Sequence, residues 1–493
     1  TGTDLTGTTA RIRAKKPDGS WGPWYDSETL ADVGAIETLG RNGTVVRQPT
    51  GPGGPRRYRR IAADSDHRGH FALDLSTGTP DSSLLPDLSG ALAHVSNRTL
   101  TSSYLDQPVL PELEEALRER WPFVPEEITV VDGAMDALDR IAQVVVRLGD
   151  RVIVEHPTFP PLLDLLEQIG VEVIGVPTDD EGIEIDGLTD ALRRSPTALF
   201  LQPRAQNPTG VNMSASRARA VARAIEESDV AESITIIEDD HAGDIASGDL
   251  HSIGRHLPRR TVHIRSYSKS HGPDLRLAAV GGAGDVISRA ANRRLLGPGW
   301  SSRILQAVLL ELLDDERTLN TLRESRDEYA RRRRTVVEIL SERNVRTTGT
   351  DGINLWMWVA DERSALLALA AQGIGAAPGE PFMVLEHPDA LRVTVGLLGP
   401  STDITAVSQA LASAAISSGG LEERKCGVAD GALAVVLEPD RLADRENGVV
   451  VLDEFGGADQ FETLQLVVRL PTLDEPGDLR IAPQIQHLLA LAE

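Results

Sequence analysis

The sequence has almost no cysteine and few aromatic residues. Cys426 is the only cysteine among 493 residues, so the chain can form neither an intramolecular disulfide nor a cysteine-based metal cluster. Aromatic residues make up 4% of the chain, so aliphatic residues must supply most of the core. No run approaches 18 consecutive apolar residues, and the first residues lack the apolar stretch of a secretory signal. We therefore expect a cytoplasmic protein with no membrane partner and no metal site.

Charge of one sign dominates the chain but is unevenly spread. The formal net charge is −24, which argues against a surface that binds polyanions throughout. Basic residues gather near the N-terminus, above all in the RRYRR cluster at 56–60, whereas the chain from residue 428 onward is strongly acidic. Turn-rich stretches at 49–55 and 417–420 interrupt any helix or strand. These shifts predict domain boundaries.

The boundaries divide the chain into four predicted parts. They are an N-terminal extension with linker (1–55), a large domain with an N-terminal arm (72–310), a small domain (311–416) and an acidic, β-rich appendage (421–493). Within the extension, residues 34–49 have the pattern of a β-hairpin with Asn-Gly at its turn.

Between these ends, strand-like and helix-like segments alternate. Short β-branched apolar runs occupy 127–133, 150–157, 171–177, 197–203, 233–240 and 261–268, and helical spacing occurs at 110–121, 134–148 and 161–170. The runs lack strict alternation, which suits strands buried on both faces. The pattern predicts an α/β domain with a mostly parallel sheet, whose ligand lies at the carboxyl ends of the strands.

Five short motifs follow these strands in a fixed order. They are Gly133-Ala134-Met135, Pro157-Thr158-Phe159, Asn207-Pro208-Thr209-Gly210, Glu238-Asp239-Asp240-His241 and Ser266-Tyr267-Ser268-Lys269. In this order they resemble the fold-type I pyridoxal-phosphate enzymes, more narrowly the class I/II aminotransferases and the aminotransferase-like domain of MocR/GntR-type proteins, over about 72–415. The resemblance implies an aspartate aminotransferase-like fold with a mixed central sheet, a smaller C-terminal α+β subdomain, pyridoxal 5′-phosphate as cofactor, and a homodimer.

The resemblance assigns the central chemistry to Lys269 and Asp239. Lys269 would hold the cofactor as a Schiff base and move the proton at the substrate Cα. This requires a lowered pKa, and we expect Arg276 to be the cation that lowers it. Asp239 ends a buried strand, where a carboxylate needs a cationic partner, and the protonated pyridine nitrogen meets that need. Asp240 is the competing candidate, and the resemblance favours Asp239.

Two side chains are expected at the phenolic oxygen of the cofactor ring. Asn207 opens an NPTG turn, and its amide would donate to that oxygen. The family usually has a tyrosine where this chain has His241. Histidine can donate the same bond, but its charge ordinarily changes near neutral pH, which makes the pH dependence of the site hard to predict. The alternative for His241 is an ordinary loop histidine.

The remaining predicted contacts concern the cofactor phosphate, its ring and the substrate. A strand-to-helix turn at Gly133, Ala134 and Met135 would present backbone N–H groups to the phosphate. Further phosphate ligands would be Ser266, Ser268, Arg276 and Tyr104, the last reaching a neighbouring subunit. Phe159 would stack on the ring, unless it is a core residue. Arg392 would grip the substrate carboxylate, and the Gly78 backbone would lie over the substrate.

The sequence therefore predicts a pyridoxal-phosphate-dependent aminotransferase acting on an amino acid and a 2-oxo acid. One alternative is a MocR/GntR-type transcription regulator that senses the cofactor, because residues 34–49 resemble the wing of a winged helix and RRYRR is basic. The helices that should precede a wing are not recognisable, so DNA is possible but not favoured, and the hairpin can equally be a structural remnant. Another alternative is a decarboxylase or lyase using the same site.

Overall fold

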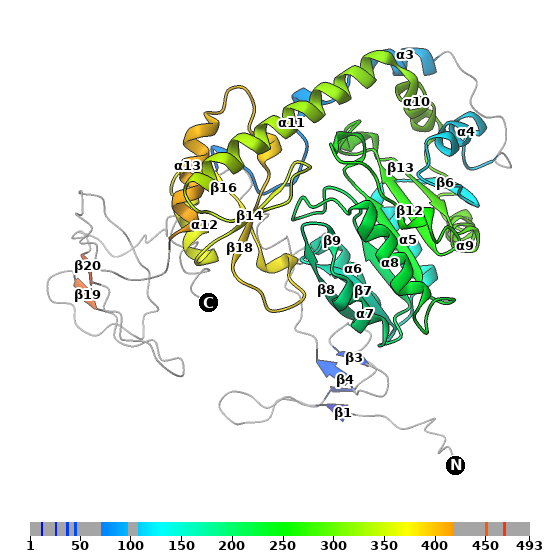
Figure 1. Cartoon of the computed structure of the whole chain (residues 1–493), viewed down its shortest axis with the longest axis horizontal. Coiled ribbons are helices and arrows are strands. Elements are labelled where there is room, and N and C mark those ends of the chain that lie inside the picture. The colour runs from blue at the N-terminus through cyan, green and yellow to red at the C-terminus, as the bar shows by residue number, and fades with distance from the viewer. Residues whose placement is uncertain are drawn as a thin grey trace. The chain divides into compact units, whose positions relative to one another are not determined.

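The computed structural model describes residues 71–96 and 107–417, together with the backbone of short strands near both ends. Residue contacts divide the chain into Thr1–Gly419 and Gly420–Glu493. All described helices belong to the first of these units (Figure 1). None of these helices combines the length and the apolar character needed to cross a bilayer.

An eight-stranded sheet forms the centre of what we call the large domain. Its strands, in spatial order, are β6 (Glu127–Val131), β13 (Ala278–Gly282), β12 (Thr261–Ser266), β11 (Thr235–Asp240), β10 (Ala198–Leu201), β7 (Arg151–His156), β8 (Glu172–Asp179) and β9 (Gly182–Ile183). The run from β12 to β8 is parallel, whereas β13 is antiparallel to both its neighbours and β9 is antiparallel to β8. The carboxyl ends of β7, β10, β11 and β12 therefore meet at one edge.

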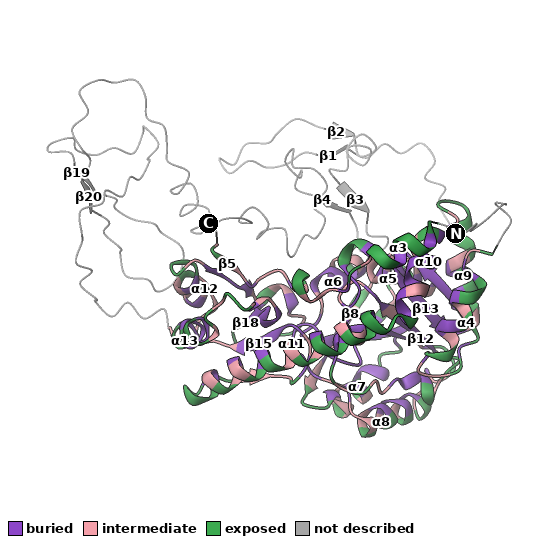
Figure 2. Ribbon diagram, turned by 90° about the horizontal axis from the view of Figure 1, so that it is seen from above, coloured by how far each residue is buried: buried purple, intermediate pink, exposed green. Residues whose placement is uncertain are grey.

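Helices cover both faces of this sheet, which explains its apolar strands. One face packs against α5 (Ala134–Val145), α6 (Pro160–Ile169) and α9 (Gly284–Leu295). The other packs against α4 (Pro111–Glu119), α7 (Ile185–Leu192), α8 (Ala215–Glu226) and α10 (Arg303–Asp314). Val152, Ile153 and Val154 of β7 alternate between the faces, and all three are fully buried. Figure 2 shows this buried layer between the helices.

A second, smaller sheet forms the small domain. It has the order β14 (Thr347–Thr348), β15 (Leu355–Trp358), β18 (Ala390–Val393) and β17 (Ala377–Pro378), and it packs with α12 (Glu362–Ala370) and α13 (Ile404–Ala415). Beside it, β16 (Ile374–Gly375) pairs in parallel with β5 (Leu73–Asp74). The start of the described chain thus joins the small domain, and Leu75 lies fully buried in its core.

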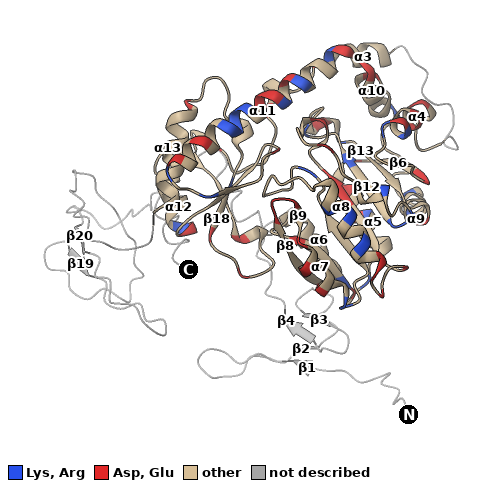
Figure 3. Cartoon of the chain, viewed as in Figure 1, with Lys and Arg blue, Asp and Glu red and all other residues tan. Residues whose placement is uncertain are grey.

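The longest described helix, α11 (Glu316–Glu342), leads from the large domain into the small one. It follows α10 of the large domain, and its C-terminal half buries Val336 and Leu340 in the small-domain core. Acidic and basic side chains are interspersed along its length (Figure 3). Such interspersed charge is typical of a helix with a solvated face.

Most of the elements expected from the sequence are present. The six predicted strands correspond to β6, β7, β8, β10, β11 and β12, and the three predicted helices correspond to α4, α5 and α6. β13 was missed because its sequence, AAVGG, has few β-branched residues. In the N-terminal extension, Ile36–Thr38 (β3) pairs antiparallel with Thr44–Val46 (β4), as the hairpin pattern predicts. Its winged-helix interpretation stays a prediction.

Because the core of the large domain is tightly packed, we expect the loss of a buried side chain from β12 to destabilise the protein strongly. Ile264 is fully buried between the sheet and α5, so we expect Ile264→Ala to lower the free energy of unfolding by about 2–5 kcal/mol. Chemical denaturation measures this change. Ile416→Ala, at an exposed residue after α13, should shift it by less than about 0.5 kcal/mol. Equal effects of the two substitutions would contradict this packing.

Candidate functional site

Three consecutive carboxylates end β11, and their surroundings differ. Glu238 accepts hydrogen bonds from the Ser252 hydroxyl (2.6 Å) and from His263 Nδ1 (2.9 Å). Asp240 is held by both Nε and Nη2 of Arg204, each at 2.8 Å. Although burial alone would raise the pKa of Asp240, the Arg204 guanidinium holds it well below the usual range. Both of these carboxylates are therefore satisfied by the protein itself.

Asp239 is the exception among the three. It is 6% exposed, and one oxygen accepts a hydrogen bond from Gln202 Nε2 at 2.7 Å. Its other oxygen, Oδ1, has no partner among the residues that the structure describes. Burial raises the pKa of Asp239 to about 6. A buried carboxylate with a free oxygen can accept a proton-bearing cation, so the geometry separates Asp239 from the competing Asp240.

Lys269 lies just beyond the end of β12 and points toward Gly78. Its Nζ donates to the Gly78 carbonyl at 3.0 Å. Burial, assisted by the positive charge of Arg392, lowers the pKa of Lys269 to about 8. The expectation that Arg276 supplies this cation is wrong, because the cation that acts on Lys269 belongs to the small domain. Lys269 is also the only lysine between residues 17 and 424.

Arg392, on β18, brings the small domain into the same site. It is 5% exposed, donates to the Ser76 carbonyl and, from Nη1, to Asn207 Oδ1 at 3.5 Å. Its guanidinium lies 5.0 Å from the centre of the Phe382 ring. Gly78 has a φ of +65°, and a Cβ there would come within 3.1 Å of Arg392 Nη1, so this position requires glycine.

Asn207 lies in the same site, in contact with Arg392. It is 4% exposed, and its Oδ1 accepts from Asn354 Nδ2 at 3.3 Å as well as from Arg392. Its backbone N–H donates to Gln202 Oε1 at 2.7 Å. Because these contacts occupy the amide oxygen, the amide NH₂ group is the part of the side chain left to donate.

His241 follows β11 directly, and its ring is neutral. Burial, followed by the positive charge of Lys269, lowers the pKa of His241 to about 3. Its Nδ1 has no hydrogen-bond partner in the described part of the chain. Titration of this histidine near neutral pH, which its residue type suggests, is therefore not expected in this fold.

The predicted phosphate-binding residues gather where α5 begins. Gly133 precedes the helix with a φ of +103°, and Ala134 and Met135 form its first turn. A Cβ on Gly133 would lie 3.4 Å from Arg276 Nη2, which itself donates to the Asp132 carbonyl at 3.2 Å. The first turn of a helix offers N–H groups without intrahelical partners, so an anion placed here meets both these groups and the guanidinium.

The remaining predicted cofactor ligands are Ser266, Ser268, Phe159 and Tyr104. Ser266 ends β12, and its Oγ accepts from the backbone N–H of Ser268 at 3.3 Å. Phe159 precedes α6 and lines a small cavity together with Asp239, while it also packs on the large-domain core. Tyr104 lies outside the described residues, so its predicted contact stays a prediction.

Gln202 links two of the predicted residues, although it was not itself predicted from the sequence. Its side chain donates to Asp239 and accepts from the Asn207 backbone, both at 2.7 Å. Its own N–H donates to Glu155 Oε2 at 2.9 Å, and burial raises the pKa of Glu155 to about 8. The signal was available, since a polar residue directly follows the apolar run of β10 at the ligand-binding edge of the sheet.

A comparison with protein families identifies the family of the chain. The family model described as aminotransferase class I and II matches residues 72–411. The chain belongs to this family. A second family model, described as Rv3811 N-terminal galactose-binding domain-like, matches residues 1–49. That description differs from the winged-helix likeness of residues 34–49.

Curated relatives of this class I and II aminotransferase family member include both regulators and enzymes. The vitamin B6 salvage pathway transcriptional repressor PtsJ of Salmonella typhimurium is 32% identical over 76% of this chain and 84% of the relative. The uncharacterized HTH-type transcriptional regulator YdcR of Escherichia coli is 28% identical over 64% and 71%. The aminotransferase swnA of Metarhizium robertsii is 29% identical over 50% and 53%.

Solved structures confirm the predicted fold of the family member. Kynurenine aminotransferase of Pyrococcus horikoshii superposes with a TM-score of 0.65 at 22% identity, covering 72% of this chain and 92% of that one. Aspartate aminotransferase of Thermus thermophilus with maleate gives 0.63 at 22% identity, covering 73% and 99%. The described part of the chain therefore has the aspartate aminotransferase-like fold.

Pyridoxal 5′-phosphate is the cofactor of this family, and the residues present fit it. The free oxygen of buried Asp239 suits a protonated ring nitrogen. The start of α5 beside Arg276 suits a phosphate, and Gly133 keeps that space open. A single lysine with a lowered pKa suits an aldehyde.

The link through Gln202 predicts a change in cofactor affinity. Gln202→Ala would leave Asp239 Oδ2 and the Asn207 N–H without their partners. Because hydrogen bonds to charged groups contribute about 1.5–3 kcal/mol, we expect pyridoxal-phosphate affinity to fall about tenfold or more. Fluorescence or absorbance titration of the apoprotein measures this. Gln372→Ala, at an exposed glutamine after α12, is the control and should leave the affinity unchanged.

Proposed function

We propose that the protein is a pyridoxal-phosphate-dependent aminotransferase that transfers an amino group between an amino acid and a 2-oxo acid. The observation that carries this proposal is the placement of Lys269. It is the only lysine in the region matched by the family, and it lies beside Arg392 with a pKa lowered to about 8. An amine that can gain and lose a proton near neutral pH thus faces a guanidinium able to hold a carboxylate.

Cofactor binding would be shared among the elements at the strand ends. Asp239 would accept the ring N–H, while the Asn207 amide and neutral His241 would donate to the phenolic oxygen. Phe159 would pack against the ring. The phosphate would be bound by Gly133, Ala134, Met135, Ser266, Ser268 and Arg276, with Tyr104 as a further predicted ligand.

Substrate binding and proton movement would use residues from both domains. When bound, pyridoxal phosphate withdraws electrons from the substrate Cα through its protonated ring. Arg392 would hold the substrate carboxylate, and the Gly78 backbone would cover the substrate. Lys269 Nζ would take the proton from Cα, with the Gly78 carbonyl orienting the amine through the hydrogen bond described above. Bound substrate would place its carboxylate where Arg392 now contacts Ser76 and Asn207.

The test of this proposal is a half-reaction. Purified protein loaded with pyridoxal phosphate is mixed with single amino acids while its visible absorbance is followed. We expect one or more amino acids to abolish the absorbance of the lysine-bound cofactor and a 2-oxo acid to restore it, with the matching oxo-acid product found by mass spectrometry. Lys269→Ala should show neither change. Release of CO₂ or of an elimination product would instead support the decarboxylase or lyase alternative.

A cofactor-sensing regulator is the second candidate, and one observation favours it. PtsJ, a transcriptional repressor, is matched over 84% of its length. If the loaded protein completes no half-reaction with any amino acid and binds DNA at moderate salt, this candidate replaces the first. Because few phosphate contacts are expected from the short basic segment, such binding should weaken as salt rises. A homodimer and a cytoplasmic location remain predictions under either candidate.

The lowered pKa of Lys269 predicts how cofactor capture depends on pH. The neutral amine is the nucleophile, and its fraction rises as pH passes through about 8 rather than through the ordinary 10.5. We therefore expect the rate of covalent pyridoxal-phosphate attachment to increase steeply from pH 7 to 8 and to level off above pH 9. Borohydride trapping followed by peptide mass spectrometry measures the rate and locates the modified lysine. A rise that continues to pH 10 or beyond would contradict the lowered pKa.

A further inference from the structure

A second cavity lies where α11 passes the large domain. Its volume is about 580 Å³. It is lined by the end of α4, by the segment after β11 that includes residues 246–251, and by single residues of β12 and α11. None of its lining residues is among the predicted cofactor or substrate ligands, although Arg204 binds Asp240 beside that site. It is therefore a separate cavity with its own chemistry.

Arginine is the most frequent residue in the lining of this cavity. Its arginines are Arg120, Arg204, Arg255, Arg265 and Arg326, and its acidic residues are Glu119, Asp244 and Asp249. Arg204 and Arg120 are paired with Asp240 and Asp314, which are not lining residues, so the positive charge available to a ligand is that of the arginines without a carboxylate partner among the described residues. In a chain whose net charge is −24, such guanidinium groups at one cavity favour an anion as the ligand.

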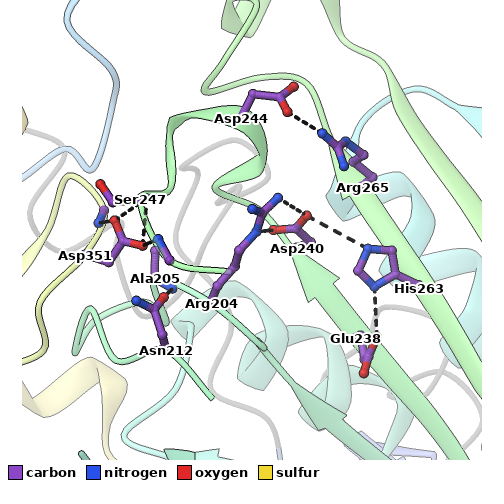
Figure 4. Close-up of polar contacts among 12 residues, drawn as sticks. Arg204, Ala205, Asn212, Glu238, Asp240, Asp244, Ser247, His263, Arg265 and Asp351 are labelled. Atoms are coloured by element: carbon purple, nitrogen blue, oxygen red, sulfur yellow. Dashed lines mark hydrogen bonds and ion pairs between the residues drawn. The ribbon is translucent and has the colours of Figure 1, made fainter. Parts of the chain in front are cut away.

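Three of these arginines are paired with carboxylates, and Arg120 is bound to Asp314. Arg204, with a side chain 10% exposed, is bound through two nitrogens to Asp240, and Arg265 contacts the Asp244 carboxylate (Figure 4). Paired guanidinium groups of this kind lose little further side-chain entropy when a ligand binds, because their positions are already set. Arg204 and Arg265 therefore form a rigid wall of the cavity.

The other two arginines, Arg326 and Arg255, bind backbone carbonyls instead of carboxylates. Arg326 donates from Nε and Nη2 to the backbone carbonyl of Asp244, at 3.2 and 3.0 Å. Arg255 donates from Nε to the backbone carbonyl of Pro122 at 3.1 Å. Neither has a carboxylate within salt-bridge distance among residues 71–96 and 107–417. Both guanidinium groups therefore keep a full positive charge and further N–H donors.

We propose that this cavity binds a small phosphate-bearing anion. Guanidinium groups match the oxygens of a phosphate in a forked geometry, and the volume lies within the range of ordinary small-molecule sites. The bound anion would contact Arg326 and Arg255 directly, against the wall formed by Arg204 and Arg265. Because Arg326 belongs to α11, which continues into the small domain, the anion would also fasten that helix to the large domain.

Calorimetry on the pyridoxal-phosphate-loaded protein tests this proposal. Loading fills the cofactor's own phosphate position, so that any further phosphate bound must use another site. Inorganic phosphate and glycerol phosphate are titrated separately, with sodium chloride at equal ionic strength as the reference. We expect one equivalent of phosphate-bearing ligand to bind. Tighter binding of glycerol phosphate would identify an organic phosphate as the ligand, and tighter binding of inorganic phosphate would identify the free ion.

Substitutions of Arg326 and Arg255, compared with Arg334 on the same helix as Arg326, show whether the cavity is responsible. Arg326→Gln should weaken phosphate binding about tenfold or more, because a hydrogen bond to a charged group is lost. Arg255→Gln, at an exposed residue, should do the same and guards against a folding defect in the first variant. Arg334→Gln, exposed on the same α11, should leave binding unchanged. Absence of saturable binding, or equal affinities in all three variants, would overturn the proposal.

Discussion

The site depends on the burial of three carboxylates at the end of one parallel strand. Strand alternation sends Glu238 and Asp240 to one face of the sheet and Asp239 to the other. On the first face, His263, Ser252 and Arg204 satisfy the two carboxylates. On the second face, Asp239 keeps one oxygen free. Because an unpaired buried charge is costly, a cation bound at that oxygen would stabilise the folded state, and cofactor binding would then be linked to folding.

The sequence was sufficient to predict the alternating strands and helices and the gathering of Asp239, Asn207 and Lys269. The strands and helices follow from local pattern, whereas the gathering of the three residues follows from the rule that ligands bind at the carboxyl ends of parallel strands and from the resemblance to the family. It was not sufficient for the pairing of Arg204 with Asp240 or for the influence of Arg392 on Lys269. Both depend on contacts between residues far apart in the chain, whose distances only the packed structure fixes.

Arginine and lysine have separate roles in this protein. Among residues 71–96 and 107–417, every ion pair that does not involve histidine uses arginine, which remains protonated at any physiological pH. The single lysine of that region is placed in the candidate site. An amine reagent or aldehyde that enters the folded domain therefore meets one nucleophilic nitrogen, and competition from other amines is confined to the chain ends.

The pairing of β5 with β16 attaches Gly78 to the small domain, which also carries Arg392. Gly78 follows β5 closely, and Arg392 lies in the adjoining small-domain sheet, so both are attached to the same body. Lys269 is attached to the other body. Any separation of the two would break the bond from Nζ to Gly78 and move the guanidinium away, and the pKa of Lys269 would rise toward its ordinary value. The pKa of Lys269 would thus depend on the separation of the large and small domains.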